Sequence, residues 1–486
     1  MQARRLRLAT RVLVLLAALL GACDPLDARL PPVAQEPTAT ALPTAAPPTV
    51  TPIAPTVTPT PLPTATPSPT ATATPPTATP PPTAAPLTPE PTLPMPAADE
   101  RARMFEQIWS LVRDRYIYTD YRGVDWQAAR QTYEPRAAGA ATPEEFYQAL
   151  REMIALLGDD HSRFESPRET AEEEARSSGQ WRYGGIGVNI REHSEGGLIT
   201  RLAPGGPAET AGLRPRDLIL AVGGVVFTDT AAFGPGGPSA AVRGAPGTAV
   251  ELTVRSPGAP PREVVVTRQL IDDDAFPPIM AQRLPGSQVG LLTIDTFDRA
   301  DLAERIRAQV EVLLDGGPLE GLIVDVRDNG GGFIDTLLHT LALFVDGGSI
   351  GTSSSRDTRD QVRIPGGETI ARLDRTPIVV LTSAETASAA EMFAAALQLS
   401  GRARVVGTPS AGNTENLLEH NFPDGSRLWL AEFAYRLPDG TSLEGRGVLP
   451  NRVVEAEWWR FDPADDPQLK AAIEELRAAD SVDARG

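Results

Sequence analysis

Apolar residues recur at helical spacing in residues 98–180, the first part of the chain that is rich in charged side chains. One face of a helix starting near residue 98 would carry Met104, Phe105, Ile108, Trp109 and Val112. A second helix is expected to begin at Thr142, where an N-cap residue, a proline and two acids follow one another. It ends at Gly158, and the acidic loop after it carries His161. The pattern predicts a helical N-terminal region.

Short apolar runs separated by glycines and prolines indicate a β-rich module at residues 181–270. Strands are expected at residues 184–190, 197–202 and 217–224, with a short helix within residues 204–213. The module is small enough to be one domain inserted between two larger parts.

From residue 271 to 460 the pattern changes to strands that alternate with helices, which is typical of an α/β domain. The expected strands are residues 289–294, 321–326 and 376–381, and the expected helices are residues 302–314 and 334–344. Two late strands are expected at residues 427–431 and 434–437. Residues 461–486 are expected to form a C-terminal helix, at 467–479, and a tail.

The junction after the strand at residues 376–381 carries Ser388, followed by an alanine-rich helix. A strand-to-helix turn often presents a serine nucleophile, because it exposes the oxygen and the first helix amides can stabilise an oxyanion. The same residues also fit a simple helix cap, with Ser388 as N-cap and Glu391 completing a capping box. A glycine run at residues 330–332 would let backbone amides approach a substrate oxygen. Both interpretations of Ser388 stay open at this point.

The N-terminus has the composition of an export signal and a tether. Residues 1–22 combine four arginines with an apolar run too short to span a bilayer comfortably, which predicts a secretory signal. Residues 31–97 hold 23 of the 48 prolines and only two charges, so residues 23–97 are expected to form a disordered Pro/Thr-rich tether. The sequence Leu-Gly-Ala-Cys23 resembles the lipobox of bacterial lipoproteins, which implies a lipid anchor on Cys23 and an extracytoplasmic location. A signal with a chance cysteine is the alternative.

Composition and net charge argue against several classes of binding site. The net charge of −18 argues against binding to nucleic acid or to an anionic membrane surface, so membrane contact is expected only through the lipid anchor. The single cysteine excludes an intramolecular disulfide. Four scattered histidines with no ligand-spaced pair give no sign of a zinc site, and we expect no metal or organic cofactor.

The β-rich module resembles a PDZ domain. The matching parts are a Gly-Ile-Gly-Val loop, a Pro-Ala-x-x-Ala-Gly-Leu helix and the strand after Asp217, with Arg216 where the motif has glycine. The resemblance implies that the loop amides hold the C-terminal carboxylate of a peptide, which adds a strand to the sheet edge. On this basis the substrate-binding residues are Gly185, Ile186, Gly187 and Val188.

Residues 98–460 as a whole resemble the C-terminal processing (tail-specific) serine peptidases, whose wider family includes tricorn protease. The motifs that carry the resemblance are residues 323–332, 386–391, 401–407 and 444–451, in that order. The resemblance implies an α/β fold with a crotonase-like peptidase core at residues 271–460, a helical N-terminal region and an inserted PDZ domain. It also implies that Ser388 is the nucleophile, with the N–H groups of Ala389 and Gly331 as the oxyanion hole.

The general base is where this chain departs from the processing-peptidase pattern. That branch uses a lysine 25 residues after the serine, a position occupied here by Asn413, and no lysine stands near it. The tricorn-like branch instead uses a histidine from the N-terminal region and a glutamate late in the core. His161 and Glu444 match these two, so the resemblance implies a Ser–His arrangement.

The sequence therefore predicts a lipid-anchored, extracytoplasmic serine endopeptidase that acts on proteins or peptides with free C-termini. Peptide cleavage would pass through an acyl-enzyme at Ser388, and the PDZ domain could gate the active site by moving over it. The alternative is a catalytically inactive lipid-anchored PDZ scaffold that binds peptide C-termini without cutting them. In that case replacing Ser388 would change nothing except stability.

Overall fold

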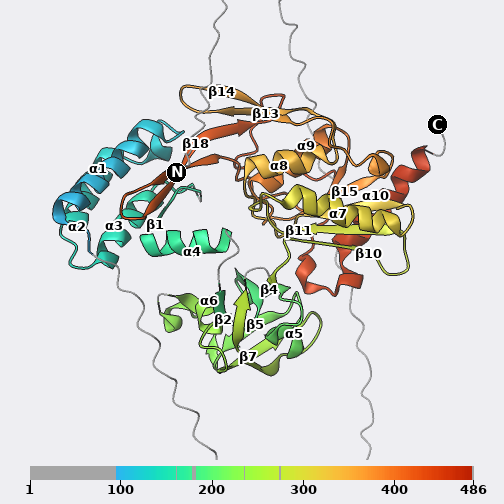
Figure 1. Ribbon diagram of the computed structural model, residues 1–486, viewed down its shortest axis with the longest axis horizontal. Helices are drawn as coiled ribbons and strands as arrows, with labels where there is room; N and C mark the ends of the chain where they lie inside the picture. Colours follow the sequence, from blue (N-terminus) through green and yellow to red (C-terminus); the bar gives the residue numbers. More distant parts are fainter. Residues whose placement is uncertain (1–94, 160, 178–181, 235, 273–274, 484–486) are drawn as a thin grey trace, which may run out of the picture. The chain divides into compact units, whose positions relative to one another are not determined.

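The computed structural model describes residues 95–159, 161–177, 182–234, 236–272 and 275–483 (Figure 1). The expected signal segment, Cys23 and almost all of the tether lie outside these residues. Within the described part of the chain, no helix is both long and apolar enough to cross a membrane.

The N-terminal region packs three of its α-helices together, α1 (Ala98–Arg115), α2 (Trp126–Ala138) and α3 (Pro143–Ala155), and a fourth helix, α4 (Pro167–Ser177), follows them in the chain (Figure 1). The predicted face of α1 is buried, and α3 begins where expected, with the Thr142 side chain accepting the N–H of Glu145. Helix α2, which Asp125 caps by accepting the N–H of Ala128, was not predicted from the sequence. The three helices share one apolar cluster with Phe164 and with Leu428 of a later strand.

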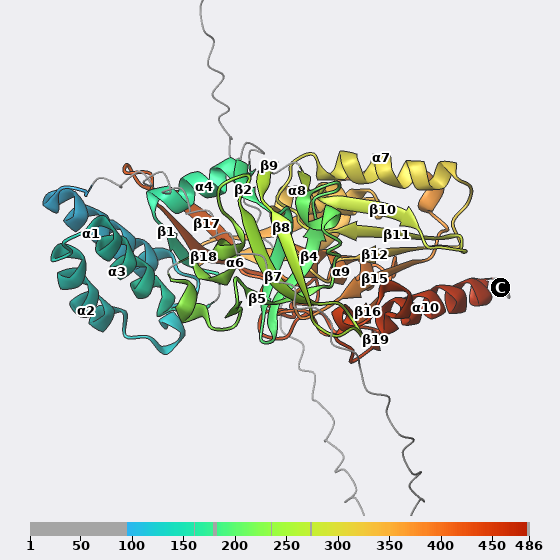
Figure 2. The same ribbon diagram turned by 90° about the horizontal axis from the view of Figure 1, so that it is seen from below.

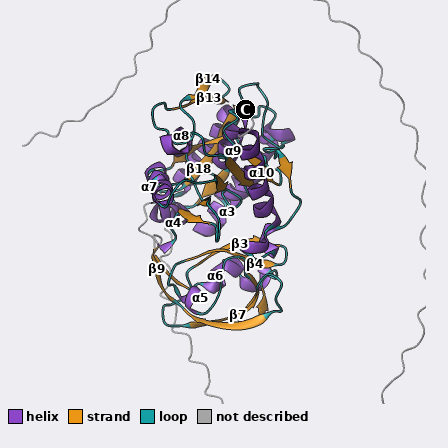
Figure 3. Ribbon diagram, turned by 90° about the vertical axis from the view of Figure 1, so that its right-hand side faces the viewer, coloured by secondary structure: helices purple, strands orange, loops and turns teal. Residues whose placement is uncertain are grey.

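The β-rich module has one sheet in the order β3-β4-β5-β7-β8, with β6 paired to β5 and a separate pair of β2 and β9. Its elements are β2 (Arg182–Gly185), β3 (Val188–His193), β4 (Gly196–Leu202), α5 (Pro207–Thr210), β5 (Leu218–Val222), β6 (Val225–Val226), α6 (Gly237–Val242), β7 (Ala249–Arg255), β8 (Arg262–Thr267) and β9 (Gln269–Asp272). The short helices α5 and α6 lie beside the strands (Figure 3). Alternate residues of β7 and β8 point into its apolar core.

Arg216, which stands where the PDZ motif has glycine, keeps a glycine-like backbone with φ +76°. Its guanidinium donates hydrogen bonds to the Phe461 carbonyl at 2.8 Å and to Asp466 Oδ2 at 3.0 Å, both in the C-terminal segment. This arginine thus accepts backbone strain but adds partly buried polar contacts between the PDZ-like module and the C-terminal segment.

The core sheet runs in the order β10-β11-β12-β15-β16-β19, and all pairs except β10–β11 are parallel. Its strands are β10 (Ile279–Arg283), β11 (Val289–Ile294), β12 (Gly321–Asp325), β15 (Ile378–Thr382), β16 (Arg404–Gly407) and β19 (Arg452–Val453). Helices α7 (Leu302–Asp315), α8 (Ile334–Ala342) and α9 (Ala389–Leu399) share one apolar cluster with the sheet, and α10 (Pro467–Asp483) shares another (Figure 2). Because both faces of β12 and β15 are covered, these strands are continuously apolar rather than alternating.

A second sheet joins the N-terminal region to the core. Its order is β1-β18-β13-β14, with β17 also paired to β18. The strands are β1 (Arg163–Glu165), β13 (Gly348–Ser354), β14 (Arg359–Ile364), β17 (Asn416–Asn421) and β18 (Arg427–Arg436). The prediction of two separate late strands, at residues 427–431 and 434–437, is wrong, because β18 is one continuous strand.

The break between those expected strands fell at Glu432, a charged residue that the pattern placed outside a strand. In the structure Glu432 is buried within β18, where its carboxylate pairs with His420 at 2.6 Å and with Arg115 at 3.1 Å. One end of β18 pairs with β1 and β17, and the other end pairs with β13. This long strand brings the loop before β1 next to the segment before β17.

Candidate active site

Ser388 lies at the turn between β15 and α9, as the sequence predicted, and is the N-cap residue of α9. Its backbone angles are φ 53° and ψ −122°, a combination that residues other than glycine rarely adopt. The Ser388 N–H donates hydrogen bonds to the Asn413 carbonyl at 2.8 Å and to Glu391 Oε2 at 3.0 Å. The turn therefore presents this serine in a strained conformation fixed by its neighbours.

Glu391 is the residue that fixes the turn. Its carboxylate is fully buried and accepts hydrogen bonds from the N–H groups of Ser388, Asn413 and Gly412 and from the Ser410 hydroxyl, at 2.6–3.0 Å. The bond to Ser388 is half of a capping box, so the cap interpretation holds alongside the nucleophile interpretation. The other bonds attach the loop at residues 410–413 to the start of α9.

Gly331 packs directly against the serine turn. A Cβ added to Gly331 would lie 2.7 Å from the Ser388 Cβ and 3.1 Å from the amide nitrogen of Ala389, so only glycine fits. Among the described residues the Ala389 N–H has no hydrogen-bond acceptor, whereas the Gly331 N–H donates to Asn329 Oδ1 at 2.8 Å. The oxyanion roles of Ala389 and Gly331 stay predictions, and of the two Ala389 has the amide free to donate.

His161 lies in the loop between α3 and β1 and is 7% exposed. Asp159 orders this loop by accepting the N–H groups of His161, at 3.2 Å, and Ser162, at 2.7 Å. The Ser162 hydroxyl donates to Asp159 and accepts the N–H of Ala431 in β18. These contacts hold the imidazole against the strand that connects the N-terminal region to the core. Asp160, which precedes His161 in this acidic loop, lies outside the described residues.

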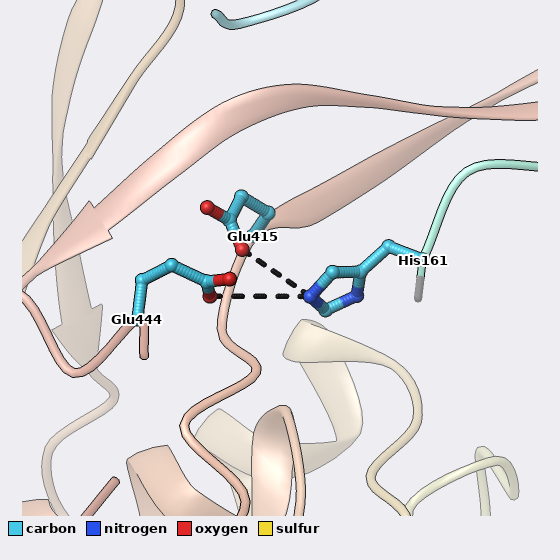
Figure 4. Close-up of side chains that lie close together, drawn as sticks. All are labelled: His161, Glu415 and Glu444. Atoms are coloured by element: carbon cyan, nitrogen blue, oxygen red, sulfur yellow. Dashed lines mark ion pairs between the residues drawn. The ribbon is translucent and has the colours of Figure 1, made fainter. Parts of the chain in front are cut away.

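Two carboxylates face the Nε2 atom of His161 (Figure 4). Glu415 Oε2 lies 3.2 Å away, and Glu444 Oε2 lies 3.9 Å away. Glu415 precedes β17 and is almost fully buried, and its Oε1 accepts a short hydrogen bond from the Tyr118 hydroxyl. Glu444 follows β18, and its Oε2 accepts the N–H of Thr414 at 2.8 Å. His161 and Glu444 are thus neighbours, as the resemblance implied, but Glu415 is closer to the ring.

Each of the two glutamates affects the pKa of the other. Burial, together with a hydrogen bond to Glu415 and its charge, raises the pKa of Glu444. Burial alone would also raise the pKa of Glu415, but its contacts with His161, Glu444 and Tyr118 lower it.

Ser388 and His161 line the same cavity, of about 600 Å³, together with Gly331, Asn413 and Glu415. The nucleophile and the candidate base, which are more than 200 residues apart in the sequence, thus line one cavity that could admit a peptide. Asn413, at the position of the family lysine, contributes its backbone to the serine turn. The only lysine of the chain, Lys470, lies on α10 and pairs with Asp465. A Ser–Lys dyad is therefore impossible in this protein.

The predicted peptide-binding residues lie elsewhere. Ile186, Gly187 and Val188 line a second cavity, of about 620 Å³, between β3, β4 and α6 on one side and the core on the other. Gly185 belongs to β2 and pairs with Gln269 of β9. Gly187 has φ +74° and packs against Ala203, where a Cβ would approach to 3.1 Å.

Core carboxylates form the opposite wall of the second cavity. Asp295 pairs with Arg201 of β4 at 2.9 Å, and Asp328 pairs with Arg191 of β3 through a short contact. Burial raises the pKa of each of these two carboxyls to about 6, although arginine opposes the shift. The cavity is thus lined by charge pairs that connect the β-rich module to the core.

Sequence reasoning missed Glu415, Glu391 as a loop anchor, and Asp159. The missed signal for Asp159 is an aspartate two residues before a histidine, a spacing at which its carboxylate can accept backbone N–H groups. Glu415 has no comparable local signal. Its role arises from contacts with residues far away in the sequence.

Three sequence families match this chain in the order expected. The description "Tricorn protease C1 domain" matches residues 97–155, "PDZ domain" matches residues 198–256, and "Peptidase family S41" matches residues 288–454. The last match contains Ser388, Glu415 and Glu444.

Curated relatives and solved structures agree with these matches. The carboxyl-terminal-processing protease of Synechocystis sp. is 31% identical over 391 residues, covering 78% of this chain and 88% of that protein. The chloroplastic carboxyl-terminal-processing peptidase 2 of Arabidopsis thaliana is 29% identical over 392 residues. The match covers 78% of this chain and 73% of that protein. The structure of a photosystem II D1 C-terminal processing protease aligns with a TM-score of 0.53 and 26% identity, covering 74% of this chain and 94% of that one. The structure of a putative S41 protease from Bacteroides fragilis aligns with a TM-score of 0.50 and 17% identity, covering 76% of this chain and 97% of that one. At this identity the likeness supports the fold alone.

The expected order of helical region, PDZ domain and α/β core is confirmed by these likenesses. A serine held in a strained turn beside a glycine loop is the feature of the core that suits acyl transfer. The chain belongs to peptidase family S41, among the carboxyl-terminal-processing proteases with a PDZ domain, and is a serine-type peptidase.

Proposed function

We propose that the protein is an extracytoplasmic, lipid-anchored endopeptidase that cleaves proteins near free C-termini through an acyl-enzyme at Ser388, with His161 as the general base. One observation carries the proposal. The buried imidazole of His161 lines the same cavity as Ser388 and is backed by two carboxylates, in a chain whose only lysine is remote.

The chemistry follows from what each group can do. Ser388 must lose a proton when it attacks the substrate carbonyl, and an uncharged imidazole nitrogen can accept it. Glu415 and Glu444 face Nε2, so they favour a proton on that atom and leave Nδ1 with a free lone pair. The positive charge that develops on the ring is stabilised by the same carboxylates. Ala389, with a free N–H next to the serine, would donate to the oxyanion.

Substrate capture is proposed for the second cavity. Ile186, Gly187 and Val188 line it, as a PDZ carboxylate loop would, and β3 offers an edge to which an extended peptide can add. The proposed location and anchor rest on residues 1–22 and Cys23 alone. Replacing Cys23 with Ala is expected to move the protein from the membrane fraction to the soluble fraction after cell lysis.

The decisive experiment compares Ser388→Ala, His161→Ala and His420→Ala in the full chain, using unfolded proteins and peptides with apolar C-termini as substrates. His420 is the matched control, because it also pairs with a glutamate but does not line the catalytic cavity. We expect the first two variants to lose more than about 10³-fold in kcat/KM and the control to keep its activity.

Other outcomes are equally clear. Loss of activity only in Ser388→Ala would keep the nucleophile and reject His161 as the base. A wild-type chain that binds C-terminal peptides but cuts none would replace the proposal with the inactive scaffold, an interpretation that the family membership does not favour.

A further inference from the structure

The cluster of His161, Glu415 and Glu444 has more binding capacity than a general base needs. One ligand atom from each side chain, an imidazole nitrogen and two carboxylate oxygens, lies within 4.8 Å of the others (Figure 4). A triad of this type needs only one acid beside the histidine. The cluster has two, and they come from separate segments on either side of β18.

Two of these atoms are buried without a hydrogen-bond partner. His161 Nε2 and Glu415 Oε2 lie 3.2 Å apart, yet among the described residues neither has an aligned donor or acceptor. His161 is 7% exposed and Glu415 is 2% exposed, so water access is minimal. A buried polar atom without a hydrogen-bond partner costs folding free energy. Such an atom in a native structure therefore indicates a possible binding partner, such as an ion. Both residues belong to the cluster whose third ligand atom is an oxygen of Glu444.

The spacing of the ligand atoms suits a small divalent cation. In tetrahedral zinc sites the metal lies about 2.0–2.2 Å from nitrogen and oxygen ligands, which places neighbouring ligands about 3.4 Å apart. The two distances from His161 Nε2, 3.2 Å and 3.9 Å, lie on either side of that value. An imidazole with two carboxylates is a zinc-type ligand set, whereas Mg²⁺ and Ca²⁺ prefer oxygen ligands only.

Supporting contacts already orient the carboxylates. The Tyr118 hydroxyl donates to Glu415 Oε1, which leaves Oε2 for the cluster. The Thr414 N–H donates to Glu444 and fixes its carboxylate. Such outer contacts are typical of metal sites, where they hold ligands in place. In the described part of the chain, no arginine or lysine lies within ion-pair distance of either glutamate, although the charge of Arg122 acts on Glu444.

We propose that His161, Glu415 and Glu444 form a binding site for Zn²⁺ or a similar first-row divalent cation, and that its occupation reversibly inhibits the peptidase. The inhibitory part rests on the proposed function. A metal on Nε2 uses that lone pair, so the proton of a neutral ring must move to Nδ1. Neither nitrogen can then accept the proton of Ser388. The fourth metal ligand would be water or an oxygen of a substrate in the adjoining cavity.

Binding is tested without reference to activity. The full chain carrying Ser388→Ala and Cys23→Ala, which removes the only thiol, is titrated with ZnCl₂ by calorimetry and in competition with a chromophoric chelator. We expect one ion per chain with micromolar or tighter affinity and a rise in Tm on binding. Glu415→Gln, which keeps the size of the side chain, and His161→Ala should each weaken binding at least about 100-fold. The matched control His420→Ala removes a His–Glu pair that has no third ligand, and it should bind normally.

Inhibition is tested with the wild-type chain. Activity should fall on addition of ZnCl₂ at the concentration that saturates the site and return on addition of EDTA. No zinc binding, or binding that survives in both Glu415→Gln and His161→Ala, overturns the site. Binding without loss of activity overturns the inhibitory role, and so does activity that disappears with EDTA, since the metal would then be required. If the wild-type chain cleaves nothing, the proposed function fails while the calorimetric result still decides the metal site.

Discussion

The strained conformation of Ser388 makes a quantitative prediction about stability. At φ 53° and ψ −122° a residue with a Cβ atom is strained, whereas glycine is not. We compare Ser388→Ala, which keeps the Cβ, with Ser388→Gly, which removes it. Both variants lack the hydroxyl, so they differ only in backbone freedom and in one methyl group.

The magnitude follows from two opposing terms. Strain at such a backbone position costs on the order of 1–3 kcal/mol for residues other than glycine. Glycine loses roughly 0.5–1 kcal/mol through the greater freedom of the unfolded chain. The glycine variant should therefore be more stable than the alanine variant by about 1 kcal/mol, within a range of about 0–2.5 kcal/mol. Glycine is also preferred to alanine at ordinary helix N-caps, so strain is measured by how far the difference exceeds the roughly 0.5–1 kcal/mol expected of a cap alone.

Urea denaturation of both inactive variants, followed by circular dichroism, measures the difference. Ser400, at the other end of α9, is the matched control because its φ is −72° and ψ is −6°. There the alanine variant should be more stable than the glycine variant. If alanine were also the more stable residue at position 388, the serine turn would not be strained and the argument for a preorganised nucleophile would fail.

Two further predictions concern buried carboxyls. Glu391→Gln should lower the free energy of unfolding by about 3 kcal/mol, because its amide would point N–H groups at donors that now give charge-assisted hydrogen bonds. It should also lower kcat by loosening the Ser388 turn, and a loss below about 0.5 kcal/mol in urea denaturation would contradict the anchor role. The second concerns Asp295, whose pKa burial raises from 3.8 to about 6 despite its pairing with Arg201. Its contribution to stability is therefore full below about pH 4 and is lost as the pH rises through 6. The stability of wild type minus that of Asp295→Asn should fall by about 3 kcal/mol between pH 4 and pH 7.5, and a rise would contradict this assignment.

Local sequence pattern was sufficient for most of the elements near the site. β11 and α7 begin and end within one residue of the expected bounds, because period and flanking turn residues define both. Ser388 was found from its position between an apolar strand and an alanine-rich helix. Its cap partner Glu391 was found because it is only three residues away.

Pattern failed where a residue is satisfied by distant partners. The charge of Glu432 led to the prediction of a break between two strands. In the structure Glu432 lies inside β18, where it pairs with His420 and Arg115. The resemblance also placed a glutamate beside His161, and Glu444 does lie near it, at 3.9 Å. Nothing near Glu415 in the sequence marks it as the closer carboxylate.

The amino-acid sequence by itself determined the order of the domains, the serine turn and the absence of a lysine that could act as base. These depend on residues within a few positions of one another, whose periodicity, capping and identity act locally. Only the tertiary structure decided that His161, Glu415 and Glu444 meet. They meet because β18 pairs antiparallel with both β1 and β17, so the loop before β1 and the segments flanking β17 and β18 converge at one end of that sheet. Strand pairing of this kind depends on packing between distant segments, which no local pattern in the chain records.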